Sequence, residues 1–568
     1  MSWTLFYGAL AVALLSLGIR TLLSRKQPPL PPGPQGLPFL GNLLAIRSSL
    51  VKNEQHHLYR KWGHQYGELM RVKFGPTDAY YLNSPHAVKD VLDKNSAATS
   101  DRGRYIVSGE LMTNGWQVLL LNASDPRWKL HRRIVASNLT NINKADDSLP
   151  ILNYETLKSL HYLVSEPGLA ASAEGIWDEI GRLTYSKSST YAVGMDIASR
   201  GDPAIKYIMY TATEQILGTL PAYWVVDVFS WLSHLPGFLK PWEKHARGLW
   251  ESDIQYAREK LERLKQPGSR GLYPNSFLAK ILKDDKLLGF PNEEEPAYLA
   301  MNLIHAAADT SWFTLWSFME AMLTHPDVQR KAQEEIDKVV GDRLPVWEDL
   351  EHIPYIRYVM KENWRWRPPV GLGHSHASTK DLVYNGHLIP KGSRIYINAF
   401  AIHYDPARFP DPDVFRPERY EGDTAGSEQS RNSPDIDKRD HFVFGSGRRG
   451  CPGSHLADRT VSVTMMRFLW AFDIVLNEGA KLPINPTTYP GPLPGNTGPS
   501  LPFHLQLRSE KRKDLIEKFW VEAEKEWAPI ASSEYSRQNN RSARCLSMIK
   551  SNYSNEGIGS QAQALSEW

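Results

Sequence analysis

The sequence has very little cysteine: two residues, Cys451 and Cys545, in a chain of 568. So few thiols exclude a disulfide framework and suit a reducing compartment. The chain also lacks a strong charge imbalance, because 66 Lys and Arg residues face 63 Asp and Glu residues and the formal net charge is +3. A chain this long and this close to neutrality gives no support for nucleic-acid binding.

Repeats, low-complexity runs and evident linkers are also missing between about residue 40 and residue 507. Helical stretches fill the middle of this region, and strand-like pieces lie near both ends, at residues 68–75, 78–83, 394–400 and 503–507. This distribution predicts a single large, mainly helical domain with small β-sheets (α+β) over residues 43–507. We expect residues 508–568 to form a tail outside it, charged and helix-prone up to about Trp527 and disordered beyond.

The N-terminus contains one uncharged apolar run, from Trp3 to Ile19. Its length is near the lower limit for crossing a bilayer, and the positive charges that follow predict that the bulk of the chain is cytoplasmic. A cleaved signal peptide is the alternative, but the basic residues lie on the wrong flank for one. We therefore expect a transmembrane anchor at residues 1–24, followed by a proline-rich hinge at residues 25–42.

The stretch "FGSGRRGCPG" at residues 444–453 permits two interpretations. Residues 445–450 fit G-x-G-x-x-G, a nucleotide-binding loop, with strand-like residues before it and a helix and Asp473 after it. However, a proline-rich segment follows Asp473 where further parallel strands would be needed, and Cys451-Pro452 interrupts the turn into the helix. The nucleotide interpretation is therefore disfavoured.

The second interpretation is a glycine-framed turn that presents one thiol. Pro452 suits the first helical position, which makes Cys451 the expected N-cap, where the helix dipole favours a thiolate. A lone thiolate cannot complete a zinc site, but it can serve as the axial ligand of haem iron. Arg449 would then pair with a haem propionate. A buried structural cysteine remains the plain alternative.

The motif Phe444-x-x-Gly447-x-Arg449-x-Cys451-x-Gly453 resembles the haem-binding signature of the cytochrome P-450 family, the haem-thiolate monooxygenases. The resemblance implies the cytochrome P-450 fold and haem b (iron protoporphyrin IX), with Cys451 as the axial iron ligand. It also implies cofactor contacts from Phe444, Arg449 and Gly453.

Further motifs agree with this resemblance in the expected order. Alone, Glu362 and Arg365 would be read as a solvated pair on a helix surface. With Arg419 of "PERY", they resemble the structural triad of the family. The resemblance further implies that three residues hold the haem propionates: Trp128, Arg132 and His376.

The apolar helix expected at residues 298–325 carries Asp309 and Thr310 in its middle. A structural pair bonded to the local backbone is one interpretation of these buried polar groups. They also resemble the acid–alcohol pair that delivers protons to dioxygen in the family. Ala307 departs from the family pattern, which usually has glycine there, and this puts the efficiency of oxygenation in doubt.

The resemblance implies an enzyme that oxidises a hydrophobic small molecule with O2 and with electrons from NADPH through a reductase. It extends to membrane-bound fungal members that tailor secondary metabolites, and it implies a single-pass protein of the endoplasmic reticulum membrane with a cytoplasmic catalytic domain. Substrate contacts are expected from residues 106–121 and 224–238, and from four pocket positions: Ile304, Ala307, Val370 and Leu372. Two alternatives stay open, namely a haem-thiolate enzyme that desaturates, rearranges or dehydrates such a molecule, and a haem-free binding protein.

Overall fold

The computed structural model describes residues 27–52, 54–197, 199–220, 223–266, 275–481 and 501–531. The expected anchor at residues 1–24 and the polar end that contains Cys545 lie outside these ranges. Within them, no helix combines the length and the apolar character needed to cross a membrane.

Helices make up most of the described chain, which confirms the mainly helical class with small sheets. The α-helices before the centre of the chain are α2 (Leu43–Val51), α3 (Gln55–Tyr66), α4 (Pro85–Val88), α5 (Pro126–Leu139), α6 (Ile142–Asp146), α7 (Leu149–Ser165), α8 (Pro167–Ala170), α9 (Ala173–Val193), α10 (Pro203–Leu217), α11 (Val225–Val228), α12 (Pro241–Lys265) and α13 (Phe277–Leu282). Those that follow are α14 (Glu294–Thr324), α15 (Pro326–Val340), α16 (Pro354–Trp366), α17 (Ala399–His403), α18 (Ser427–Arg431), α19 (Ser454–Ala471) and α20 (Glu510–Ala531).

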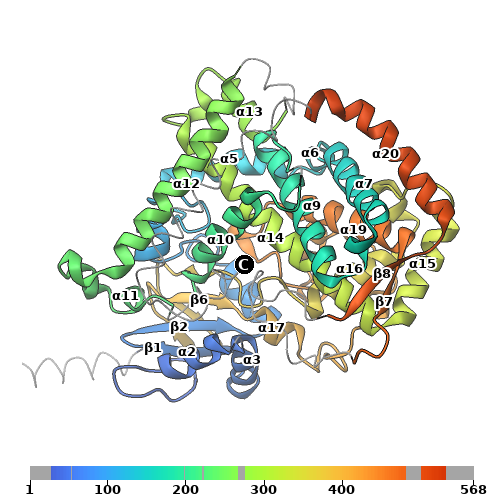
Figure 1. Ribbon diagram of the computed structural model, residues 1–568. Coiled ribbons are helices and arrows are strands. Elements are labelled where there is room, and N and C mark those ends of the chain that lie inside the picture. The colour runs from blue at the N-terminus through green and yellow to red at the C-terminus, as the bar shows by residue number, and fades with distance from the viewer. Residues whose placement is uncertain are drawn as a thin grey trace, which may run out of the picture.

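Helix α14 is the central element of the fold. Figure 1 shows it in the middle of the molecule, and it packs against α9, α10, α12, α16 and α19. Apolar residues occur all around this helix, as expected for a helix buried on most sides. It begins at Glu294, four residues before the expected start at residue 298, and ends at Thr324, one residue before the expected end. The first turn contains two acidic residues, whose negative charges stabilise the helix by their interaction with the positive end of its dipole.

Helix α9 is the neighbour that covers one side of α14. The Ser172 side chain accepts a hydrogen bond from the Gly175 N–H and starts the helix, and Gly194 ends it in the left-handed conformation with φ 73°. Both ends are therefore fixed by local sequence, so that the helix presents a defined face to α14.

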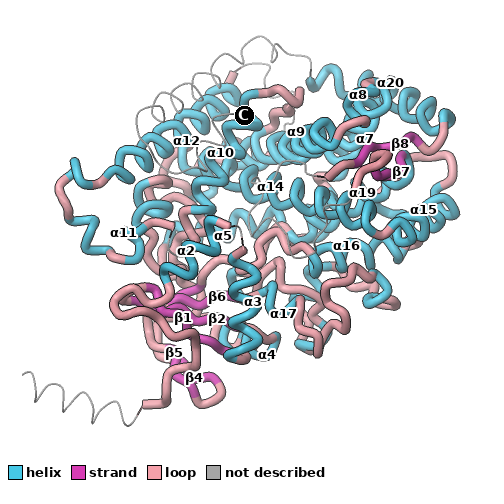
Figure 2. The backbone as a smooth tube through the Cα atoms, turned by 60° about the horizontal axis from the view of Figure 1, so that its bottom comes forward, coloured by secondary structure: helices cyan, strands magenta, loops and turns pink. Residues whose placement is uncertain are grey.

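Strands form three small sheets around this helical body, from β1 (Leu69–Phe74), β2 (Thr77–Leu82), β3 (His376–Ala377), β4 (Leu382–Tyr384), β5 (His387–Ile389), β6 (Arg394–Ile397), β7 (Phe472–Leu476) and β8 (Phe503–Leu507). The largest has the order β1-β2-β6-β3, in which β2 and β6 run parallel with Tyr81 opposite Tyr396. Figure 2 shows this sheet at one end of the molecule and the two-stranded β7–β8 sheet at the other. The expected strand at residues 394–400 is shorter, because the chain turns into α17 at Ala399.

The antiparallel pairing of β7 with β8 removes the nucleotide-binding interpretation of residues 445–450. Strand β7 carries Asp473 and pairs antiparallel with β8, whereas a dinucleotide fold requires parallel neighbours. Residues 441–444, which looked like the preceding strand, form no strand.

The charged segment after Arg508 differs from the expected tail outside the domain. It forms α20, which packs along α7 at the edge of the molecule in Figure 1. Ile516 and Trp520 are buried there, and the Trp520 ring stacks on His161 with centroids 5.0 Å apart. Apolar side chains at helical spacing dock this amphipathic helix, so the folded body continues to Ala531.

Candidate functional site

The loop before α19 turns tightly around the Cys451 thiol. Gly445 and Gly447 adopt φ values of 69° and 63°, which side chains rarely tolerate, and the Cys451 N–H donates to the Phe444 carbonyl at 2.8 Å. The Phe444 ring packs edge-on against Trp364 with centroids 5.1 Å apart. Cys451 is a free, half-buried thiol, and no group of three or more His, Cys, Asp or Glu residues that could hold a metal occurs in the described ranges. The loop therefore offers a single sulfur ligand.

The predicted N-cap role of Cys451 is wrong. Helix α19 begins at Ser454 with Gly453 as its N-cap, so the sulfur lies two residues outside the cap. The Gly453 N–H still donates to Sγ at 3.4 Å. Burial raises the pKa of the Cys451 thiol above its usual value, while this N–H, Arg132 and Arg431 act in the opposite direction. A metal ion that binds the sulfur would take the place of this proton.

Three arginines lie together beside this loop without a carboxylate partner. None of the ion pairs found among the described residues includes Arg102, Arg132 or Arg449. Their guanidinium groups donate to backbone carbonyls instead: Arg102 to Ser375 at 2.7 Å, Arg449 to Ser100 at 2.7 Å, and Arg132 to Gly450. Burial and the neighbouring Arg102 and Arg132 lower the pKa of Arg449 to about 8. Such a cluster is strained by mutual repulsion unless an anion joins it.

Trp128 and His376 complete the surroundings of this cluster. Arg449 lies over the Trp128 ring, with 4.3 Å between the guanidinium carbon and the ring centroid. The Nδ1–H of His376, on β3, donates to the Thr99 carbonyl at 2.8 Å. Burial and Arg102 lower the pKa of His376 to about 3, so the imidazole is neutral with Nε2 available as an acceptor. The structure thus brings the four predicted propionate residues into one region, and Arg102 joins them.

The predicted triad forms a fully buried ion pair with a third partner. Arg365 donates to Glu362 through Nε and Nη2, both at 2.7 Å, and Arg419 Nε lies 3.3 Å from the same carboxylate. The Arg416 N–H also donates to Glu362, at 2.8 Å. Glu362 and Arg365 are 0% exposed, which rejects the solvated-pair interpretation. Arg365 also binds three backbone carbonyls, so the triad ties α16 to the loops at residues 403–419.

The middle of α14 has one open face. Ala306 is exposed and Thr310 is half-buried, although Ala308 next to them is fully buried. The Thr310 hydroxyl donates to the Ala306 carbonyl at 2.8 Å, so it bonds to its own helix as the structural interpretation expected. Asp309 does not share this face, since it is 3% exposed and accepts a hydrogen bond from the Tyr185 hydroxyl of α9.

The four predicted pocket positions are not in equivalent surroundings. Ala307 and Val370 are half-buried, whereas Ile304 is buried in the main core and Leu372 packs in a separate apolar cluster with Tyr396. The two longer segments expected to contact substrate do meet, because residues at 106–112 and 224–226 share one apolar cluster with α12.

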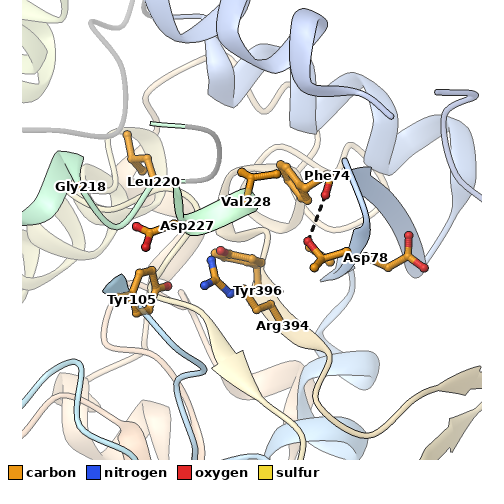
Figure 3. A pocket seen from close by; sticks show the side chains of 11 residues that line it. Phe74, Asp78, Tyr105, Gly218, Leu220, Asp227, Val228, Arg394 and Tyr396 are labelled. Atoms are coloured by element: carbon orange, nitrogen blue, oxygen red, sulfur yellow. Dashed lines mark hydrogen bonds between the residues drawn. The ribbon is translucent and has the colours of Figure 1, made fainter. Parts of the chain in front are cut away.

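A pocket lies where these two segments approach the first sheet. Figure 3 shows Asp227, Tyr105 and Arg394 among its lining side chains. Asp227 accepts a hydrogen bond from the Ile106 N–H at 2.6 Å, which pins α11 to the start of the π-helical turn at Ile106–Leu111. Burial raises the pKa of Asp227 to about 6. The pocket therefore combines charged side chains with apolar ones such as Phe74, Leu220 and Val228.

Comparison with known proteins gives the family. The Cytochrome P-450 family model matches residues 31–497, which is most of the chain. The chain belongs to the cytochrome P-450 family. A cytochrome P-450 monooxygenase of Gibberella fujikuroi is 46% identical over 90% of this chain and 94% of the relative. The cytochrome P-450 monooxygenases virE of Hypocrea virens and verL of Clonostachys rogersoniana are both 33% identical, over 91% and 87% of this chain and 92% and 90% of their own lengths.

Membership of the cytochrome P-450 family makes this chain a monooxygenase and implies a haem cofactor. The residues present fit that group. The lone Cys451 thiol can ligate its iron, and Arg102, Arg132 and Arg449 can neutralise its two propionates. The cluster of unpaired cations is the observation that carries the fit.

Sequence reasoning missed two residues of this site. Arg102 donates to three backbone carbonyls and lowers the pKa of Arg449, yet no motif marks it. Tyr185 precedes its partner Asp309 by 124 positions in a helix that otherwise reads as core. Only the fold brings these residues to the site.

Proposed function

We propose that this cytochrome P-450 hydroxylates or epoxidises a hydrophobic small molecule, with O2 as co-substrate and NADPH as the electron source through a reductase. The observation that carries the proposal is the lone Cys451 thiol beside three arginines that lack carboxylate partners. When bound, the haem supplies the redox-active iron at which dioxygen is reduced. One oxygen atom then enters the substrate and the other leaves as water.

The chain's own residues would bind, orient and protonate. Cys451 would give up its thiol proton and hold the iron through Sγ, and the Gly453 N–H would stabilise the resulting negative charge. Arg102, Arg132 and Arg449 would fix the orientation of the cofactor by charge-assisted hydrogen bonds to its propionates. Asp309 holds a proton near neutral pH, since burial raises its pKa to about 7.

We also propose that the enzyme acts in secondary-metabolite biosynthesis and is anchored in the endoplasmic reticulum membrane. Similarity to fungal monooxygenases supports the role in secondary metabolism. The apolar run at residues 3–19, outside the described residues, supports membrane anchoring. Fractionation of cells that express the full chain and a variant without residues 1–24 tests the anchor. Recovery of both in the soluble fraction would refute it.

The cofactor is tested by the reduced carbon-monoxide difference spectrum of the purified protein. We expect the red-shifted Soret band of a thiolate-bound haem in the wild type and its loss in Cys451→Ala. Cys545→Ala, which removes the other thiol of the chain, is the matched control and should keep the band. A band that survives in Cys451→Ala overturns the assignment of the ligand.

The reaction is tested by incubating the protein with reductase, NADPH and a fungal metabolite extract under ¹⁸O2. A product that gains one labelled oxygen atom supports monooxygenation. A product that loses two hydrogens or rearranges without gaining label would instead establish the alternative haem-thiolate reaction.

A further inference from the structure

Asp309, the predicted proton-carrying acid, faces α9 and not the open face of α14. Residues along an α-helix are about 100° apart around its axis, so Thr310 and Asp309 cannot point the same way. Thr310 lies on the same side as the exposed Ala306, four residues earlier, and bonds to its carbonyl. Asp309 instead lies in the interface with α9, where the Tyr185 hydroxyl donates to its Oδ1.

The two helices approach closely enough for this contact because α9 has a glycine at the crossing. A Cβ atom at Gly181 would lie 2.9 Å from the Trp312 ring of α14, which is closer than any real side chain allows. Tyr185 follows Gly181 by one turn of α9, and Asp309 precedes Trp312 by one turn of α14. The close contact between Gly181 and Trp312 therefore brings Tyr185 and Asp309 together. The Tyr185 ring meets Trp312 edge-on with centroids 6.0 Å apart. Tyr185 is fully buried.

In the part of the chain that the structure describes, no cation pairs with the Asp309 carboxyl. Among the described residues no ion pair includes it, and the groups that face it are uncharged at neutral pH. Tyr185 from α9 is neutral, since burial and Asp309 raise its pKa well above the usual value. His305, one turn earlier on α14, is neutral because burial lowers its pKa to about 4, and it contacts Thr211 of α10. The Tyr185 hydroxyl is thus the donor on which the ionised form of Asp309 depends.

We propose that Tyr185 is the positioning residue for Asp309, holding the acid against α9 and away from the open face of α14 until it exchanges a proton. This inference rests on the proposed function, because it gives the acid of that reaction its partner. The hydroxyl has two effects that a merely structural contact lacks: it fixes the rotamer of Asp309, and it stabilises the carboxylate over the carboxylic acid.

Tyr185→Phe is the direct test, since it removes one oxygen atom and keeps the ring against Trp312. Infrared spectroscopy of the purified protein follows the carboxylic-acid band of Asp309, identified by its absence in Asp309→Asn. Burial raises the Asp309 pKa to about 7, and the hydrogen bond from Tyr185 acts in the opposite direction. Loss of this hydrogen bond should therefore raise the midpoint of the Asp309 titration further. We expect an upward shift of about one pH unit, typical for a hydrogen bond to a charged group.

Tyr191→Phe is the matched control. Tyr191 is on the same helix and is buried, but its hydroxyl donates to the Asn138 carbonyl at 3.2 Å. This control should leave the midpoint unchanged. An unchanged midpoint in Tyr185→Phe, or an equal shift in both variants, overturns the proposal.

Two further measurements keep the test independent of folding and of the cofactor. If Tyr185→Phe does not accumulate as folded protein, Asp309→Asn tests the same contact from the other side. The ultraviolet resonance Raman band of Tyr185 should then move, because an amide is a weaker hydrogen-bond acceptor than a carboxylate. A band that does not move refutes the contact. The infrared midpoint needs no haem, so a missing carbon-monoxide band refutes the proposed function while the shift still decides on Tyr185. In the haem-loaded enzyme the pH profile of product formed per NADPH oxidised should move with the same sign.

Discussion

Replacing Glu362 with glutamine is expected to lower the free energy of unfolding by about 3 kcal/mol, which follows from the geometry of the buried triad. The wild-type carboxylate accepts two hydrogen bonds from Arg365, one from the Arg416 N–H, and lies 3.3 Å from Arg419. Glutamine has nearly the same shape but no charge and a single acceptor oxygen. It therefore leaves Arg365, which is 0% exposed, without a counter-charge.

The magnitude follows from comparing two opposing effects. Breaking a buried ion pair by removing one partner typically costs about 3–5 kcal/mol. Arg365 keeps three backbone carbonyl acceptors, those of His403, Pro412 and Val414, which soften the loss and place the expectation at the lower end. Urea unfolding followed by circular dichroism, with the protein loaded with haem to the same extent, measures the difference.

Glu243→Gln provides the matched control for this measurement. Glu243 also contacts two cations, Arg247 and Lys240, but on the exposed side of α12. Surface pairs are worth about 1 kcal/mol or less, so the control should change stability by no more than that. A Glu362→Gln protein whose stability equals that of the control would refute the argument that burial makes this pair structural.

Three further outcomes are expected. Deleting residues 510–568 removes α20 and with it the buried Trp520, which should lower stability by roughly 2–3 kcal/mol in urea unfolding, whereas deleting only residues beyond 531 should not. Burial raises the pKa of Asp253 to about 7, so the stability that this group contributes is complete below about pH 4 and is lost as the pH rises through 7. In thermal melts, Asp253→Asn should therefore be more stable than the wild type at pH 8 but not at pH 4. Asp227→Ala should speed deuterium exchange at the Ile106 amide, which loses its acceptor, and an unchanged rate would contradict the pinning of α11.

The sequence was sufficient to predict structural features that depend on residues close together in the chain. The glycines around Cys451 predicted a turn that presents the sulfur, and the strand-like stretches at 68–75, 78–83 and 503–507 predicted β1, β2 and β8 within one residue. The sequence failed at the start of α19, where proline suggested a cap two residues too early. A proline restricts only its own part of the backbone and does not fix where the helix begins. Here the Gly453 N–H donates a hydrogen bond to Cys451 Sγ, and the helix begins after it.

Contacts between distant segments could be predicted only where a family motif marks the residues, as in the triad of Glu362, Arg365 and Arg419. The Tyr185–Asp309 hydrogen bond depends on how closely α9 and α14 approach, which Gly181 allows, but a glycine inside a helix reads only as a weak helix position. Likewise α20 reads as a charged helix, and only the α7 surface with His161 shows which face is buried.

The pairing of buried charges locates the cofactor site in a way that net charge cannot. Elsewhere in the described chain, Arg182 has Glu155 and Glu179, and Arg365 has Glu362. The buried Arg467 has no carboxylate either, but it is a single cation held by the oxygens of Pro345, Asn153 and Thr156 and not one of a cluster. Arg102, Arg132 and Arg449 repel one another and bind only backbone oxygens. Since a fold does not keep uncompensated cations together without a use for them, the missing negative charge must come from a ligand. The two propionate carboxylates of a haem held by Cys451 would supply it, so that the cofactor would complete an electrostatic balance that the polypeptide alone leaves open.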